Sequence, residues 1–87
     1  MSEPRDGMAD GRTVRVSVTL KGTLAGHLPG GRAEMDVARG TAVGGLIEVL
    51  RLPRSSYLFV VNGAMVDRDA LLSEGNHVQI HPPMAGG

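Results

Sequence analysis

A strict alternation of apolar and polar residues between Thr13 and Leu20 constrains the fold more than any other feature of this sequence. The apolar positions are Val14, Val16, Val18 and Leu20. Because successive side chains of a β-strand point to opposite faces, this period predicts a strand that buries one face and exposes the other. The chain is therefore expected to begin its fold with a half-buried strand.

A hairpin is expected after this strand. Residues 21–32 are rich in glycine and contain Pro29, which favours a connection made of turns. The next segment, residues 33–38, predicts a second strand whose Met35 and Val37 face inward. The two strands would then be joined as neighbours by the glycine-rich connection.

One helix is expected between Thr41 and Pro53. Its apolar stripe follows the helical spacing i, i+3, i+4 and i+7, and consists of Val43, Leu46, Ile47 and Leu50. Thr41 is a suitable N-cap residue. Gly44 and Gly45 lie inside the helix and cost it about 1 kcal/mol each relative to alanine, so the helix should depend on packing. Close approach to the sheet would explain both glycines.

The remaining segments predict further strands. The apolar run 57–61 predicts a buried strand, the pair Asn62-Gly63 a tight turn, and residues 64–66 a short strand. Residues 77–81 predict the last strand, and Pro82-Pro83 ends it because proline has no backbone N–H to donate. This order favours an α+β fold of the β-grasp type, a mixed four- to five-stranded sheet with one main helix packed across one face. The first and last strands would be parallel neighbours at its centre.

The chain divides into one domain and two tails. Residues 1–12 are polar and lack the apolar run that a signal peptide or a membrane helix needs, so they predict a flexible N-terminal tail. Residues 13–81 would form the β-grasp domain, for which a chain of 87 residues has sufficient length. Residues 82–87 would form a flexible C-terminal tail that ends in Gly86-Gly87.

Composition argues against several classes of function. The 9 Lys and Arg residues balance 9 Asp and Glu residues, so no strong field attracts nucleic acid or an anionic membrane. The absence of cysteine excludes disulfides, thiolate metal sites and a cysteine nucleophile. His77 and His81 fall on one face of the last strand, but a metal site needs more converging ligands than these. A cytoplasmic protein without a metal, monomeric when free, is expected.

Three segments resemble the ubiquitin-like sulfur carriers of the MoaD/ThiS family. They are Val61-Asn62-Gly63, the run from Asp69 to Val78, and the ending Pro82-Pro83-Met84-Ala85-Gly86-Gly87. The strongest match covers residues 60–87, whereas residues 13–58 agree in the order of elements. The combination of these motifs is far more specific than the Asn-Gly turn alone.

The resemblance implies a carrier and not an enzyme. A partner, an E1-like enzyme, would use ATP to adenylate the carboxylate of Gly87, after which sulfur would displace AMP and leave a thiocarboxylate. The chain itself would bind no cofactor. The loaded carrier would serve a molybdopterin synthase large subunit or a thiazole synthase, in molybdopterin or thiamine biosynthesis.

The C-terminal tail suits this chemistry. Gly86 and Gly87 have no Cβ, so they can thread a narrow channel and present an unhindered carbonyl group. Pro82-Pro83 stiffens the base of the tail and lowers the entropy that threading costs.

Partner docking is expected beside the tail. If Leu58 and Val60 meet the helix, the alternate residues of the same strand emerge on the open face of the sheet as an apolar patch. This patch would consist of Tyr57, Phe59 and Val61. The tail would add Pro83, Met84 and Ala85. The alternative is that a loop or the N-terminal tail covers the patch.

Two other functions share the same features. A ubiquitin-like modifier would begin with the same acyl-adenylate and end with Gly87 attached to lysines of other proteins. A β-grasp interaction module would carry a tail with no chemistry of its own.

Overall fold

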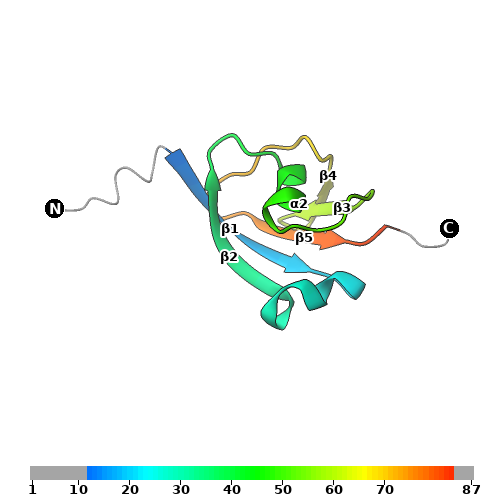
Figure 1. The fold of residues 1–87 in the computed structure, drawn as a ribbon. Coiled ribbons are helices and arrows are strands. Elements are labelled where there is room, and N and C mark those ends of the chain that lie inside the picture. Colours follow the sequence, from blue (N-terminus) through cyan, green and yellow to red (C-terminus); the bar gives the residue numbers. More distant parts are fainter. Residues whose placement is uncertain (1–11, 84–87) are drawn as a thin grey trace.

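The computed structural model describes residues 12–83 of the chain, in which five strands form one mixed sheet. Their order across the sheet is β2-β1-β5-β3-β4 (Figure 1). The strands are β1 (Thr13–Leu20), β2 (Arg32–Ala38), β3 (Leu58–Val61), β4 (Ala64–Val66) and β5 (His77–His81). β1 and β5 are parallel, and the other neighbouring pairs are antiparallel. The predicted β-grasp fold, with its first and last strands paired near the centre, is confirmed.

The core lies on one face of the sheet. The four apolar residues that alternate along β1 are at most 3% exposed, as the period of the sequence predicted. Val37 of β2, together with Val78 and Ile80 of β5, is buried on the same face. Leu46 of α2 (Leu46–Val49) and Leu72 cover these strands. A single apolar layer between sheet and helix therefore holds the domain together.

The covering helix is shorter than the sequence predicted. A 3-10 turn, η3 (Val43–Gly45), precedes α2, which has only four residues. The prediction that Thr41 caps the helix is wrong, because Ala42 occupies the cap position and no side chain bonds there. The Val43 N–H instead donates to the Ala70 carbonyl at 2.7 Å. The connection from β4 to β5 thus satisfies a backbone group that a cap would otherwise serve.

Gly44 lies where another segment of the chain approaches the helix closely. Its N–H donates to the carbonyl of Arg68 at 2.9 Å. A Cβ on Gly44 would lie 3.0 Å from both the Cβ and the carbonyl oxygen of Arg68. The neighbour that requires a small residue is therefore the connection from β4 to β5, and not the sheet itself.

Replacement of Gly44 by alanine is expected to lower the free energy of unfolding by up to about 2 kcal/mol. Overpacking against a hydrogen-bonded backbone costs about 1–3 kcal/mol, and the better helix propensity of alanine offsets about 1 kcal/mol. Gly45→Ala is the matched control, because its Cβ would meet only the Thr41 methyl group, at 3.3 Å. Gly45→Ala should leave stability unchanged or raise it by up to about 1 kcal/mol, through the better helix propensity of alanine. Equal losses for the two variants in urea unfolding would contradict this account.

α2 ends at a residue that is unusual in this position. Arg51 has a φ of 58°, in the left-handed region that favours glycine. The Leu52 N–H donates to the Ile47 carbonyl at 2.9 Å, and the Arg51 N–H donates to the Glu48 carbonyl at 3.1 Å. These two bonds form a Schellman motif, with Arg51 in its left-handed position.

Arg51→Gly is therefore expected to stabilise the domain by about 1 kcal/mol, because glycine adopts this backbone conformation without a Cβ penalty. The gain should appear as a higher midpoint of urea unfolding with an unchanged slope. Arg54→Gly is the control, because Arg54 is exposed and is not among the residues with positive φ. A gain of the same size in Arg54→Gly would rule out the backbone explanation.

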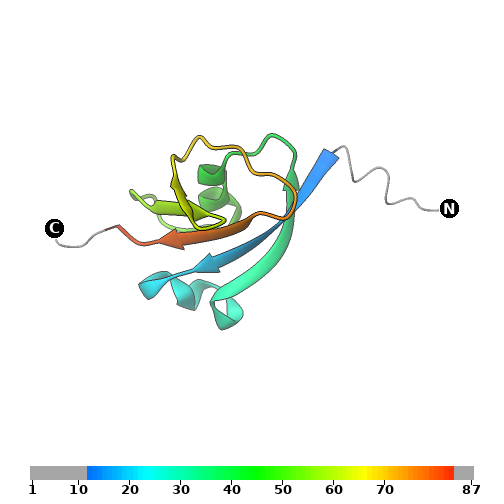
Figure 2. The same ribbon diagram turned by 180° about the vertical axis from the view of Figure 1, so that it is seen from behind.

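The connection between β1 and β2 is more structured than a plain hairpin turn. It contains two 3-10 turns, η1 (Gly22–His27) and η2 (Pro29–Gly31). Leu24 of η1 is buried in the core. This apolar anchor draws the connection against the end of the sheet instead of leaving it in solvent. Figure 2 shows the two turns at the same end of the molecule as the end of β5.

Candidate functional site

β5 leads directly into the C-terminal tail. It lies between β1 and β3 in the sheet and ends at His81, after which the half-buried Pro82 and the exposed Pro83 follow. The predicted site residues Met84, Ala85, Gly86 and Gly87 lie outside the described residues. The structure therefore defines the base of the tail, and that base is held by the strand with neighbours on both sides.

The base of the tail is fixed by contacts from the β1–β2 side. The Lys21 N–H donates to the Ile80 carbonyl at 3.0 Å, which extends the β1–β5 pairing to the end of β5. Gly22 follows with a φ of 58°. A Cβ on Gly22 would lie 3.2 Å from Cγ of Pro82. The sequence placed Gly22 in the hairpin connection but contained no signal for its contact with Pro82.

The open face of the sheet carries an apolar surface, but from different residues than the sequence predicted. Phe59 is only 5% exposed and pairs with the fully buried Ile80 across β3 and β5. Leu58, which was expected to face the helix, is 38% exposed. The predicted orientation of β3 is therefore wrong by one residue. The core accommodates the large Phe59 ring, and a one-residue change of register moves the whole strand to the opposite face.

The other two predicted docking residues of this strand are also turned toward the core. Tyr57 and Val61 are partly buried and pack against the hydrophobic core. The Tyr57 hydroxyl donates to the Pro53 carbonyl, which ties the segment before β3 to the end of the α2 region. Neither residue forms the exposed patch that was expected of them.

The apolar residues of the open face are Leu58, Val60 and Met65, which we call the β3–β4 stripe. Val60 pairs with Met65 across β3 and β4, so the two side chains share a face. Met65 is 69% exposed. Leu58 pairs with His81, the last residue of β5. The stripe therefore begins at the base of the C-terminal tail and extends to the edge of the sheet.

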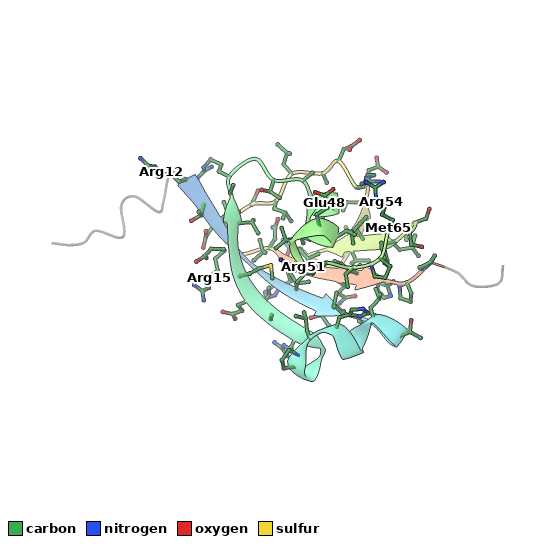
Figure 3. All side chains as sticks on the ribbon, viewed as in Figure 1. Arg12, Arg15, Glu48, Arg51, Arg54 and Met65 are labelled. Atoms are coloured by element: carbon green, nitrogen blue, oxygen red, sulfur yellow. The ribbon has the colours of Figure 1, made fainter. Side chains whose placement is uncertain are left out.

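The other half of the open face is charged. Arg15 of β1 pairs with Glu34 (Nε to Oε1, 3.5 Å) and with Asp36 (Nη1 to Oδ1, 3.7 Å), both on β2. These exposed pairs contribute little to stability. In Figure 3, Arg15 lies toward the N-terminal end of the molecule and Met65 toward the C-terminal end. The apolar stripe is thus the half of the face that adjoins the tail.

Asn62 closes the turn that the Asn-Gly pair predicted. Both residues have positive φ, 51° for Asn62 and 87° for Gly63. The Asn62 side chain also accepts a hydrogen bond from the His77 N–H at 2.8 Å, while its own N–H donates to the His77 carbonyl at 2.8 Å. Asn62 therefore both turns the hairpin and fastens β3 to the start of β5.

The two histidines of β5 lie on the open face of the sheet. The His81 ring lies 3.3 Å from the Gln79 side-chain oxygen. Between residues 12 and 83, no three His, Cys, Asp or Glu side chains come together to hold a metal ion. Within the same range, no helix has the length and apolar character needed to cross a membrane.

The ThiS family model matches residues 23–87, which is 65 of the 87 residues (87 − 23 + 1). The chain belongs to the ThiS family. The match extends from η1 through β5 to Gly87, so the ThiS family model includes the whole C-terminal tail. The resemblance to ubiquitin-like carriers found in the sequence is confirmed.

Several solved structures are similar in fold to this ThiS family member. One neighbour, from Pyrococcus furiosus, is named after subunit 1 of molybdopterin converting factor; it is 22% identical, with a TM-score of 0.66 over 82% of this chain and 99% of its own. Small archaeal modifier protein 1 of Haloferax volcanii is 16% identical, with a TM-score of 0.68 over 82% and 99%. A Caldiarchaeum subterraneum ubiquitin is 14% identical, with a TM-score of 0.58 over 86% and 99%. At these identities the likeness establishes the β-grasp fold. Among curated protein sequences, none matches the chain.

Proposed function

We propose that this chain is a sulfur carrier whose Gly87 carboxylate is adenylated by an E1-like enzyme and converted to a thiocarboxylate, for molybdopterin or thiamine biosynthesis. One observation carries the proposal: a ThiS family match that continues through β5 and Pro82-Pro83 to a terminal Gly-Gly. The chain is the substrate of its partner and not a catalyst.

The chemistry explains why the tail must leave the domain. A carboxylate is a poor electrophile, so a carboxylate oxygen of Gly87 first attacks the α-phosphorus of ATP held by the partner; the acyl–AMP bond forms, the bond between the α- and β-phosphates breaks, and pyrophosphate departs. Hydrosulfide supplied by the sulfur donor then attacks the Gly87 carbonyl carbon; the carbon–sulfur bond forms, AMP departs with the electrons of the carbon–oxygen bond, and loss of the sulfur-bound proton to solvent leaves the thiocarboxylate. The reacting atoms must come within about 3–3.5 Å of each other. The chain contributes reach and recognition, and the partner contributes ATP and the catalytic groups.

The β3–β4 stripe is the surface proposed to dock the activating enzyme. Leu58 and Met65 are large apolar side chains exposed to solvent, which on a small domain marks an interaction surface. Because Leu58 pairs with His81, an enzyme that grips the tail beyond Pro82 also covers this end of the stripe. Burial of the stripe would supply binding energy although this chain has no net charge.

Intact-mass measurement tests the carrier function directly. The chain is purified from its own host, or incubated with a candidate E1-like enzyme, ATP and a sulfur donor. A gain in mass that matches one sulfur atom in place of one oxygen atom is expected. An unchanged mass in every one of these conditions would overturn the proposal and favour an interaction module with an inert tail.

The same measurement separates the carrier from the alternative of a protein modifier. Small archaeal modifier proteins share this fold, and this likeness is the observation that favours the modifier as the second candidate function. A modifier would produce conjugates of higher mass that are joined through Gly87.

To separate the pathways, the loaded chain is offered in parallel to a molybdopterin synthase large subunit and to a thiazole synthase.

A further inference from the structure

The β1–β2 connection makes direct contact with the base of the C-terminal tail. A Cβ on Gly22 would lie 3.2 Å from Cγ and 3.4 Å from Cδ of Pro82, so the proline ring occupies the space that a side chain would take. Just before Gly22, the Lys21 N–H donates a hydrogen bond to the Ile80 carbonyl at 3.0 Å. Leu24, two residues after Gly22 in η1, is buried in the core. Gly22 therefore lies between two residues that are fixed to the sheet and the core, Lys21 and Leu24, and its Cα faces the Pro82 ring.

The two prolines make the direction of the tail sensitive to this contact. The ring of Pro82 fixes its φ, and the prolines at positions 82 and 83 restrict the residue before each of them to extended conformations. A displacement of Pro82 is consequently passed along Pro83 instead of being absorbed by rotation at the next residue. Only four residues separate Pro83 from the carboxylate of Gly87, so in a docked domain a changed direction at the base changes which positions the tip can reach. An error of about 1 Å at the reacting atoms can cost a rate factor of about 100.

We infer that Gly22 is a positioning residue for the C-terminal tail. Because Gly22 has no side chain, the Pro82 ring can pack directly against its backbone, and this packing determines the direction in which the chain continues beyond Pro82. The role of Gly22 in loading rests on the proposed function. The seating of Pro82 itself does not, and can be measured without a partner.

Two glycines of the same connection provide a matched test. Gly22 and Gly30 both have positive φ, 58° and 68°, so alanine introduces comparable backbone strain at either position. A Cβ on Gly30 has nothing within 4 Å, whereas on Gly22 it presses on Pro82. Differences between the two variants at equal folded fraction therefore report the contact with Pro82, and not the strain.

Loading kinetics with the E1-like enzyme give the first readout. Gly22→Ala is expected to lower kcat/KM for adenylation at least about tenfold, mainly through kcat, because docking is intact but the tip is misplaced. Gly30→Ala should remain within about twofold of the unsubstituted chain. Addition of Gly22→Ala to a Pro82→Ala chain should cause no further loss, because the ring atoms are gone. Equal loss in Gly22→Ala and Gly30→Ala would overturn the inference and leave the proposed function standing.

A spin-label measurement on the chain alone, without the E1-like enzyme, gives the second readout. The chain contains no cysteine, so Ala85→Cys provides a unique site for a spin label in the tail. The NMR spectrum of the labelled chain shows which backbone amide signals the spin label broadens. Gly22→Ala should change this set of signals, and Gly30→Ala should not. An identical broadening pattern in both variants overturns the inference. If the unsubstituted chain is never loaded, the proposed function fails, and this pattern still decides whether Gly22 directs the tail.

Discussion

A chain without Gly86 and Gly87 is expected to gain no sulfur from an E1-like enzyme that loads the full chain. Each extended residue spans about 3.3–3.6 Å, so the deletion draws the carboxylate back by about 7 Å. Adenylation requires an approach of about 3–3.5 Å, and the rate should fall at least about 100-fold. Intact mass after incubation with enzyme, ATP and sulfur donor is the measurement.

Stability and length serve as controls for this deletion. The removed residues follow the last strand, so the midpoint of urea unfolding should not change. A chain that lacks Ser2 and Glu3 instead has lost the same number of residues from the predicted N-terminal tail, and it should still be loaded. A deleted chain that supports the same product formation as the full chain would remove the tail from the proposed chemistry and leave the domain alone as the functional part.

Replacement of Met65 by aspartate is expected to weaken the complex with the activating enzyme at least about tenfold. The change removes an apolar contact worth about 1–3 kcal/mol and places a charge in the interface, while about 1.4 kcal/mol corresponds to a factor of ten in Kd. The double variant Leu58→Asp, Met65→Asp should lose at least about 100-fold. Titration calorimetry of the complex measures Kd for each variant.

The control for the stripe is an equally exposed apolar residue elsewhere. Leu71 is 66% exposed, against 69% for Met65, but it lies in the β4–β5 connection and not in the stripe. Leu71→Asp should therefore cost as little stability as Met65→Asp and leave Kd unchanged. A loss of affinity in Leu71→Asp as large as that in Met65→Asp would show a general effect of charge, and not docking through the stripe.

The accuracy of the sequence predictions follows how much information each segment carries. β1 alternates strictly, so its period fixes both its bounds and its buried face. β3 is apolar at all four positions, and a period of two then has no contrast that could show which face is buried. The structure turned Phe59 inward because the core has space for its ring, and that space is defined by other strands.

The shortened helix and the seat of Pro82 were also beyond the reach of local patterns. The apolar stripe from Val43 to Leu50 predicted a helix correctly, but its first turn is shaped by hydrogen bonds to Arg68 and Ala70, far along the chain. The contact between Gly22 and Pro82 likewise joins residues 60 positions apart (82 − 22). Local spacing predicts elements, whereas these contacts depend on how the elements meet.

The central place of β5 has a consequence for how the domain forms. β5 is last in chain order among the five strands, yet it joins β1 to β3, and without it the sheet has no link between its two hairpins. Such contacts between distant parts of the chain give a high contact order, so folding awaits this final strand. A chain cut short before β5 would lack both the sheet and the reactive end. Under the proposed function, a fragment that ends before β5 would therefore not be loaded, and ATP would be spent only on completed domains.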